Sequence, residues 1–140
     1  MLQPKKILHK SVQKGRNRGV ATRCNDICFG KYGFKALENG LVTAKQIETI
    51  RVLISKILGK RGKMWIRIFP FKPITRKPLG VRMGSGKGAF EFWAAVIKAG
   101  CILFEIDGVD EKEIFEVANV ANDKLSIKLK CVKKENVLYI

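Results

Sequence analysis

The segment best suited to chemistry is V-R-M-G-S-G-K-G, at residues 81–88. Three glycines alternate there with small or basic residues, so backbone N–H groups of such a loop can approach a phosphate closely. That phosphate could belong to a nucleotide in an enzyme or to the backbone of a nucleic acid.

Neither common nucleotide-binding motif fits this loop. A Walker A loop, G-x-x-x-x-G-K-[ST], would put its first glycine at Val81 and its hydroxyl residue at Gly88. A dinucleotide loop, G-x-G-x-x-G, would put its third glycine at Ala89, and a strand-like pattern follows where a helix should begin. The sequence therefore predicts no nucleotide enzyme and no small-molecule substrate.

Other catalytic groups are sparse. The single histidine, His9, lies in a basic segment without a nucleophile to pair with, and we interpret it as a solvated or RNA-contacting residue. Cys24 and Cys28 are spaced C-x-x-x-C without a second pair, so we expect ordinary thiols and no zinc site. Glu105 and Asp107 are interpreted as surface charges beside a glycine turn. We therefore predict no catalytic residue, no metal and no cofactor.

The charge points to a polyanionic partner. The 140 residues carry a net charge of +16 and the sequence pI is near 10.0. Residues 1–88 hold 21 basic and 3 acidic side chains, whereas residues 89–140 hold 7 basic and 9 acidic ones. We expect one face of the protein to bind a polyanion, with nucleic acid as the first candidate and an anionic membrane surface as the second.

Neither a membrane span nor a secretory segment is expected. The longest apolar runs, such as A-A-V-I at 94–97, are far short of the ~20 residues that a span requires. The first ten residues are basic and have no apolar region or small-residue cleavage site. We predict one domain over 1–140, with residues 1–25 as a basic N-terminal extension that is extended or ordered only by its partner.

The apolar pattern predicts two helices. Thr43 followed by Gln46 marks a helix start, and Gly59 marks its end. Asp110 followed by Glu113 marks a second start. The predicted buried stripes are Ile47, Ile50, Leu53, Ile54, Ile57 and Leu58 in the first helix, and Ile114, Val117, Ala118 and Ala121 in the second.

Alternating residues predict the strands. We expect a bent strand pair at 26–37, a strand at 64–69, a hairpin made of 89–97 and 101–106, and a last strand at 126–133. Prolines at 70, 73 and 78 predict an irregular run before the glycine loop. The expected fold class is α+β: an antiparallel sheet or sandwich with two helices on one face, a basic arm and a long glycine-rich loop.

Two basic segments are predicted to contact RNA phosphates. One is the N-terminal arm with K-G-R-N-R-G at 14–19, and the other is the run from residue 60 to the glycine loop. Three aromatic residues in the second run are candidates for base stacking, although core packing is the commoner role: Trp65, Phe69 and Phe71. The candidate RNA-binding residues are Lys5, Lys6, Lys14, Arg16, Asn17, Arg18, Lys60, Arg61, Lys63, Arg67, Arg76 and Lys77.

A co-linear series of motifs closely resembles bacterial and organellar large-subunit ribosomal protein sixteen. The resemblance covers nearly the whole chain and continues through F-W-A-A-V-I and L-F-E-I-D-G-V. Ser85 departs from it, because many relatives have lysine there, and the last eight residues match no firm pattern. The matching segments are Met1–Lys5, Lys14–Gly19, Phe29–Ala36, Leu41–Glu48, Trp65–Pro70, Lys72–Thr75, Lys77–Leu79 and Val81–Gly88.

The resemblance implies a structural protein of the large ribosomal subunit, in a bacterial cytoplasm or an organelle. It implies large-subunit rRNA, aminoacyl-site tRNA, the 5S rRNA region and neighbouring ribosomal proteins as partners, and late entry into subunit assembly. It also implies that Arg82 matches an arginine hydroxylated in some bacterial members. The alternative is a free-standing RNA-binding protein or assembly chaperone. The residues implied to reach the functional centre and tRNA are Arg82, Met83, Gly84, Ser85, Gly86, Lys87 and Gly88.

Overall fold

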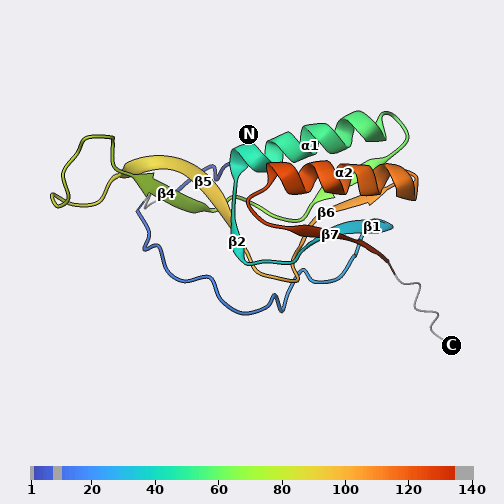
Figure 1. The fold of residues 1–140 in the computed structure, drawn as a ribbon, viewed down its shortest axis with the longest axis horizontal. Coiled ribbons are helices and arrows are strands. Elements are labelled where there is room, and N and C mark those ends of the chain that lie inside the picture. The colour runs from blue at the N-terminus through green and yellow to red at the C-terminus, as the bar shows by residue number, and fades with distance from the viewer. Residues whose placement is uncertain (1, 8–10, 135–140) are drawn as a thin grey trace.

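The computed structural model describes residues 2–7 and 11–134 and confirms the α+β class. It contains two antiparallel sheets, one of four strands in the order β3-β6-β1-β7 and one of three in the order β2-β5-β4. Figure 1 labels the elements along the chain. They are β1 (Tyr32–Ala36), β2 (Gly40–Thr43), α1 (Ala44–Leu58), β3 (Lys63–Ile66), β4 (Lys72–Arg76), β5 (Ala89–Ile97), β6 (Ile102–Asp107), α2 (Glu111–Lys124) and β7 (Leu129–Lys133).

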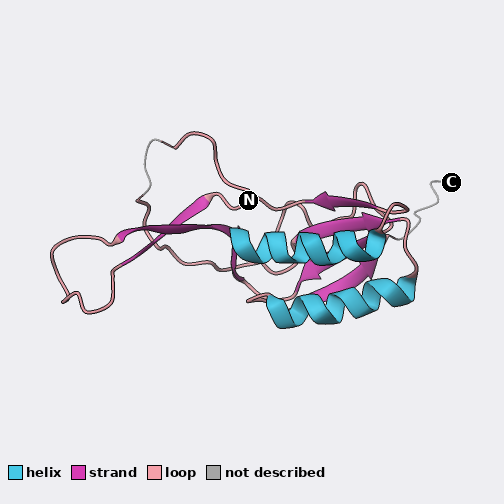
Figure 2. Cartoon of the chain, turned by 90° about the horizontal axis from the view of Figure 1, so that it is seen from above, coloured by secondary structure: helices cyan, strands magenta, loops and turns pink. Residues whose placement is uncertain are grey.

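The molecule is layered, with α1 and α2 side by side over one face of the four-stranded sheet. The second sheet leads away from this body: β4 and β5 form a ribbon that projects beyond the helices, with the glycine-rich loop at its far end (Figures 1 and 2). The N-terminal arm runs on the side opposite the helices (Figure 1). The fold thus presents a loop at one end and an arm beneath the sheets.

Helix α1 forms as predicted because its start and its end are both coded locally. The Thr43 side chain accepts a hydrogen bond from the backbone N–H of Gln46, whose side chain in turn accepts one from the N–H of Thr43. Gly59 closes the helix by donating to the carbonyl of Ser55. The predicted stripe is confirmed with Ile47, Ile50, Ile54 and Leu58 buried, while Leu53 and Ile57 pack at its margin.

The core lies between the helices and the four-stranded sheet. Phe34 and Phe104, paired on β1 and β6, are fully buried. They form one apolar cluster with the stripe of α1 and with the stripe of α2, which is also confirmed at Ile114, Val117, Ala118 and Ala121. Burial of this surface is the main favourable contribution to folding.

The predicted hairpin of residues 89–97 and 101–106 is wrong. Both segments are strands, but β5 pairs with β2 and β4, whereas β6 pairs with β1 and β3. The connection passes through Gly100, whose φ of 90° is in the left-handed region. It carries the chain from one sheet into the other, so each segment becomes a central strand of its own sheet.

Two further predictions need correction. Residues 72–76 of the supposedly irregular proline run form β4, which tolerates Pro73 because β4 is the outer strand of its sheet. The bent strand pair at 26–37 reduces to β1, and the segment before Tyr32 is a loop. The strand predicted at 126–133 begins later, at Leu129.

We predict that Thr43→Ala lowers the free energy of unfolding by about 1 kcal/mol, because it removes the cap of α1. Thr49→Ala is the matched control: its hydroxyl bonds only to the carbonyl of Lys45 inside the same helix, and alanine is the better helix former there. Urea unfolding followed by circular dichroism measures both. Equal losses in the two variants would contradict the role of the cap.

Candidate nucleic-acid interface

Residues 11–25 of the N-terminal arm form no helix and no named strand, and contacts with the sheets hold them in place. The side-chain amide of Asn17 donates to the carbonyl oxygens of Ile97 at 2.6 Å and Gly40 at 3.3 Å. Further along, the N–H of Ala21 donates to the carbonyl of Ala99 at 2.8 Å. Asn17, predicted to contact rRNA, therefore fastens the arm at the ends of β2 and β5.

The arm ends at a buried carboxylate, that of Glu105 on β6. This side chain is fully buried. It accepts backbone hydrogen bonds from Cys28 at 3.2 Å, Phe29 at 2.6 Å and Gly30 at 2.9 Å, and Arg67 donates to it from the segment after β3. The interpretation of Glu105 as a surface charge is therefore wrong, because loop 26–31 covers the face of β6 on which it lies.

Gly30 is required for this close approach. A Cβ added to it would lie 2.7 Å from the carbonyl oxygen of Ile106, closer than real Cβ contacts. The loop backbone thus rests directly on β6, and that brings its N–H groups within reach of the carboxylate.

Arg67, predicted to bind rRNA, is placed inside this cluster. Its side chain is only 15% exposed and forms an ion pair with Glu105. Its guanidinium carbon also lies 5.2 Å from the ring centroid of Phe29, and that ring stacks on Trp65 at 6.0 Å with an interplanar angle of 20°. We therefore assign Arg67 to fixing the arm.

The surroundings of Glu105 act on its pKa in opposite directions. Burial disfavours the charged carboxylate and by itself would raise the pKa. The three backbone N–H donors and Arg67 outweigh burial, so the pKa of Glu105 lies below its ordinary value. The carboxylate is therefore ionised at neutral pH and stabilises the fold in that form.

The structure brings the arm and the glycine-rich loop together. The ammonium group of Lys87 donates to the carbonyl of Val12, and that of Lys72 donates to the carbonyl of Lys14. Gly88 lies against β4, since a Cβ there would be 2.5 Å from the backbone of Arg76. The base of the loop is thus fixed both to the ribbon and to the arm.

The tip of the loop is exposed and its backbone is unusual. Met83 is 96% exposed, and Gly84, Ser85 and Gly86 all have positive φ, a conformation that favours glycine. Lys77 crosses the loop and donates to the carbonyl of Gly84. The loop is therefore thin, basic and open to a partner.

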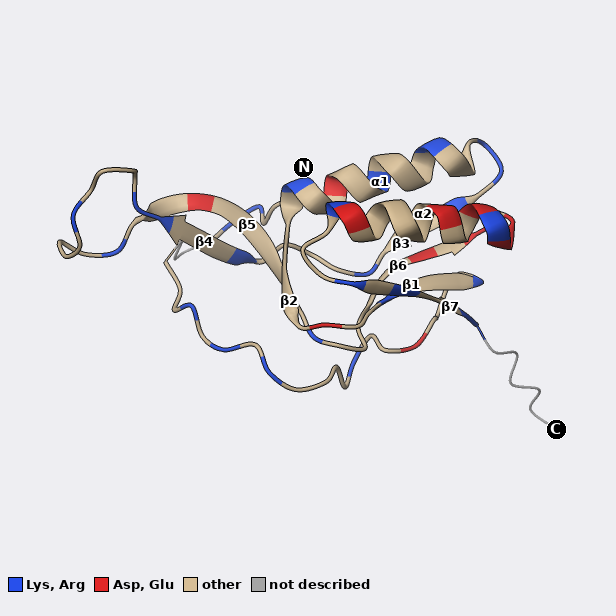
Figure 3. Ribbon diagram, viewed as in Figure 1, with Lys and Arg blue, Asp and Glu red and all other residues tan. Residues whose placement is uncertain are grey.

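The other predicted RNA contacts fall into three groups. The arm and the β4–β5 ribbon carry exposed Lys14, Arg16, Arg18 and Arg76, and Figure 3 shows basic residues along the arm and the loop. Lys60, Arg61 and Lys63 lie instead at the C-terminal end of α1, at the opposite end of the molecule from the loop. Lys5 and Lys6 are exposed near the start of the chain.

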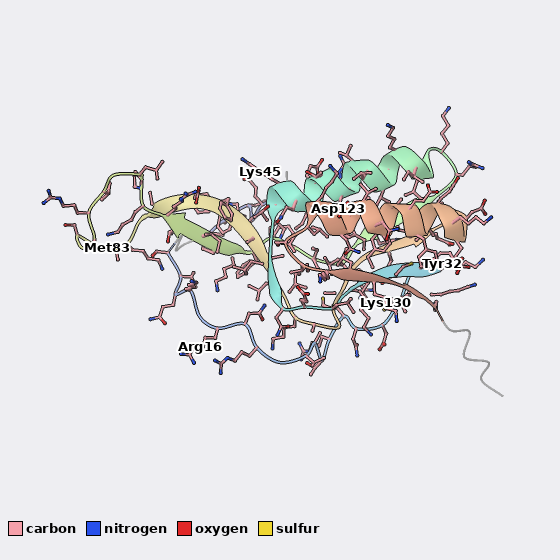
Figure 4. The ribbon with its side chains drawn as sticks, in the orientation of Figure 1. Arg16, Tyr32, Lys45, Met83, Asp123 and Lys130 are labelled. Carbon is pink, nitrogen blue, oxygen red and sulfur yellow. The ribbon has the colours of Figure 1, made fainter. Side chains whose placement is uncertain are left out.

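Five acidic residues lie on α2 or at Asp110 just before it, and the other described ones are spread over β5, β6, α1 and two loops (Figure 3). Figure 4 labels Asp123 on α2, while Arg16 lies on the arm, beneath the sheets. The arm side thus carries mostly basic side chains, whereas α2 carries four acidic and two basic ones.

The described residues contain no group of three metal-ligating side chains that could hold an ion. His9 lies outside the described residues. None of the helices in the described part of the chain has the length and apolar character to cross a membrane.

A basic arm, a projecting basic loop and the motif order can be compared with known families. The model of the family Ribosomal protein L16p/L10e matches residues 4–132. The chain belongs to this family. It is therefore a ribosomal protein, a structural constituent of the large ribosomal subunit. The family is generally non-enzymatic, and RNA binding is typical of its members.

We predict that Glu105→Gln lowers the free energy of unfolding by about 3 kcal/mol, because Arg67 loses its charged partner inside the fold. Glu91→Gln is the matched control: Glu91 pairs with Arg76 at 3.4 Å, and both side chains are exposed. This exposed pair should contribute less than about 0.5 kcal/mol. Urea unfolding measures both, and a loss in Glu105→Gln as small as that of the control would contradict the anchor.

The same variant predicts a pH dependence. Since the folded-state pKa of Glu105 is lowered, its contribution is complete above the unfolded pKa of about 4.3 and is lost as pH falls through the folded value. The difference in unfolding free energy between wild type and Glu105→Gln should thus be largest near about pH 7 and shrink in acid. A difference in unfolding free energy that stays constant down to about pH 2 would contradict a stabilising role of the ionised Glu105 carboxylate.

Proposed function

We propose that the protein binds large-subunit rRNA through its arm and its basic segments, and that the loop at 82–88 reaches the aminoacyl-site tRNA near the peptidyl-transferase centre. The observation that carries this proposal is the basic loop, which projects past the body of a ribosomal protein of this family (Figure 1). The rRNA contacts we assign are Lys5, Lys6, Lys14, Arg16, Arg18, Lys60, Arg61, Lys63, Arg76 and Lys77.

Shape and charge both support recognition of folded RNA. Lysine and arginine side chains neutralise phosphates without reading sequence, so such contacts position the protein on the RNA. The arm is long and thin enough to follow an RNA groove, and its fixed course would hold several charges in register. Exposed Phe71 offers a surface on which a base could stack.

The loop is suited to a crowded site. Its glycines have no side chains that would add bulk near the tip, while Arg82 and Lys87 keep positive charge on either side of the tip. Because the base of the loop is fixed to the β4–β5 ribbon and to the arm, the tip would keep one orientation relative to the body of the protein. The loop would stabilise a tRNA backbone as it enters the site.

The alternative is a free-standing RNA-binding protein or assembly chaperone. The two differ in where the protein resides. A structural constituent sediments with the large subunit through a sucrose gradient at moderate salt, whereas a chaperone leaves the mature particle. Absence from the mature large subunit, with retention on its precursors, would favour the alternative.

We predict that Arg82→Ala/Lys87→Ala impairs aminoacyl-tRNA accommodation or late subunit assembly at least several-fold, with little change in folding. Both side chains are exposed on the loop, so their removal takes away charge and the exposed hydrogen bond from Lys87 to the carbonyl of Val12, but no buried packing. Reconstituted large subunits carrying the variant would be tested for accommodation, and the isolated protein by urea unfolding.

Lys112→Ala/Lys124→Ala is the matched control, since it removes the same charge from α2, on the acidic side. It should leave accommodation and assembly near wild type. Wild-type accommodation and assembly in the loop variant would defeat the proposed role of the loop.

A further inference from the structure

A group of lysines lies at the β7 edge of the four-stranded sheet, and three of its four members come from the half of the sequence that carries no net positive charge. Strand β7 and its neighbour β1 form an open groove of about 590 Å³. Four of its six lining residues are lysines, three of them on or next to β7 and one on β1. The lining residues are Lys35, Lys130, Cys131, Val132, Lys133 and Lys134.

Strand geometry separates these lysines into two kinds. Successive side chains on a strand point to opposite faces, so Lys133 lies on the helix side and Lys130 on the other. Lys133 is already engaged there: its ammonium lies 3.6 Å from Glu111 and 5.8 Å from the ring centroid of Tyr32. Lys130 lies on the side of the sheet away from the helices, as its label in Figure 4 indicates.

Lys35 and Lys130 are direct cross-strand partners in the β1–β7 ladder. The Cβ atoms of such partners lie about 4.5–5.5 Å apart on one face, and like charges placed so are destabilising. Within the described residues, no carboxylate forms an ion pair with either of them or with Lys134. The ammonium of Lys134 instead donates to the carbonyl of Cys28 at 3.4 Å. In the described part of the chain, the two lysines thus lie opposite each other without a carboxylate partner.

Protection of the sheet edge does not account for this pair. Lysines on an outer strand do prevent edge-to-edge pairing, and β7 is an outer strand. Lys35, however, is on β1, which lies between β6 and β7 inside the sheet. A lysine at that position protects no edge, so edge protection does not explain why Lys35 lies opposite Lys130.

The groove also continues the surface on which the arm lies. A Cβ placed on Gly100 would be 3.4 Å from a side-chain carbon of Val20, in the arm, and 3.9 Å from Cε of Lys35. The arm and Lys35 thus meet at the turn between β5 and β6. A chain of phosphates that follows the arm would reach Lys35 and Lys130 next.

We infer that the β1–β7 groove is a binding site for the sugar-phosphate backbone of RNA, centred on Lys35 and Lys130. Each ammonium supplies a point charge for a phosphate oxygen. A bound phosphate replaces the repulsion between the two lysines by attraction to both. This inference rests on the proposed rRNA binding and extends its surface to the C-terminal strand.

The test measures the affinity of the full chain for a large-subunit rRNA transcript over one decade of salt concentration. Lys35→Gln/Lys130→Gln should reduce the slope of log affinity against log salt by about 0.7–0.9 for each phosphate that the protein no longer neutralises. Lys112→Gln/Lys124→Gln removes the same charge from α2 and should leave the slope unchanged. Urea unfolding of the groove variant should show a fold at least as stable as wild type, since it relieves repulsion.

The outcomes separate the two proposals. A steep wild-type slope with a reduced slope in the groove variant alone supports the site. A steep wild-type slope that the groove variant retains overturns the site and leaves the proposed function standing. Equal reductions in both variants also overturn it, because they reflect net charge alone. A wild type whose rRNA affinity does not respond to salt overturns the proposed function itself.

Discussion

The fold depends on one buried carboxylate, that of Glu105. Helices cover one face of the four-stranded sheet, and loop 26–31, which follows the arm, lies against the other face at Glu105. Ile27 of that loop packs against Gly33 and Phe29 stacks on Trp65, but Phe29 stays 60% exposed, so apolar packing holds the loop only in part. Glu105 accepts its three consecutive N–H groups and the guanidinium of Arg67. A charge of this kind is costly to bury, and it becomes stabilising only because every part of its environment donates to it.

The rest of the arm is held without loss of positive charge. Lys72 and Lys87 bond to backbone carbonyls of the arm, and Lys77 bonds to a carbonyl within the loop. If a carboxylate accepted the hydrogen bond of any of these lysines instead, it would hold the lysine equally well but would neutralise its positive charge. Carbonyl acceptors leave the full charge on the surface, which a polyanion-binding protein requires.

The sequence predicted those features that are encoded within a few residues. The cap and stripe of α1 are of this kind, as are the positions of β5 and β6 and the exposure of the loop. Strand partners were not predictable, because alternation identifies a strand but not its neighbours. The prediction for Glu105 was wrong for a related reason. A charged residue within an apolar run can lie on an exposed edge of the sheet or be buried with hydrogen-bond donors, and the sequence alone does not distinguish the two. The place of Glu105 in C-I-L-F-E-I, with apolar neighbours on both sides, was the available signal. The Lys35–Lys130 pair depends on a register between residues far apart in sequence.

Along the sequence, the strongly basic part ends near residue 88. In the fold, however, basic residues from both parts of the sequence lie on the same side of the sheet. Strand β7 comes from the acidic half and lies on the basic side, next to β1 and the arm. Helix α2 carries the carboxylates on the other side of the sheet (Figure 3). An RNA approached from the arm side would meet the arm and the β1–β7 groove, and it would be repelled from α2. Since Lys87 joins the loop to the arm, docking of the arm would also fix the direction of the loop. The carboxylate that anchors the end of the arm therefore bears indirectly on where the loop points.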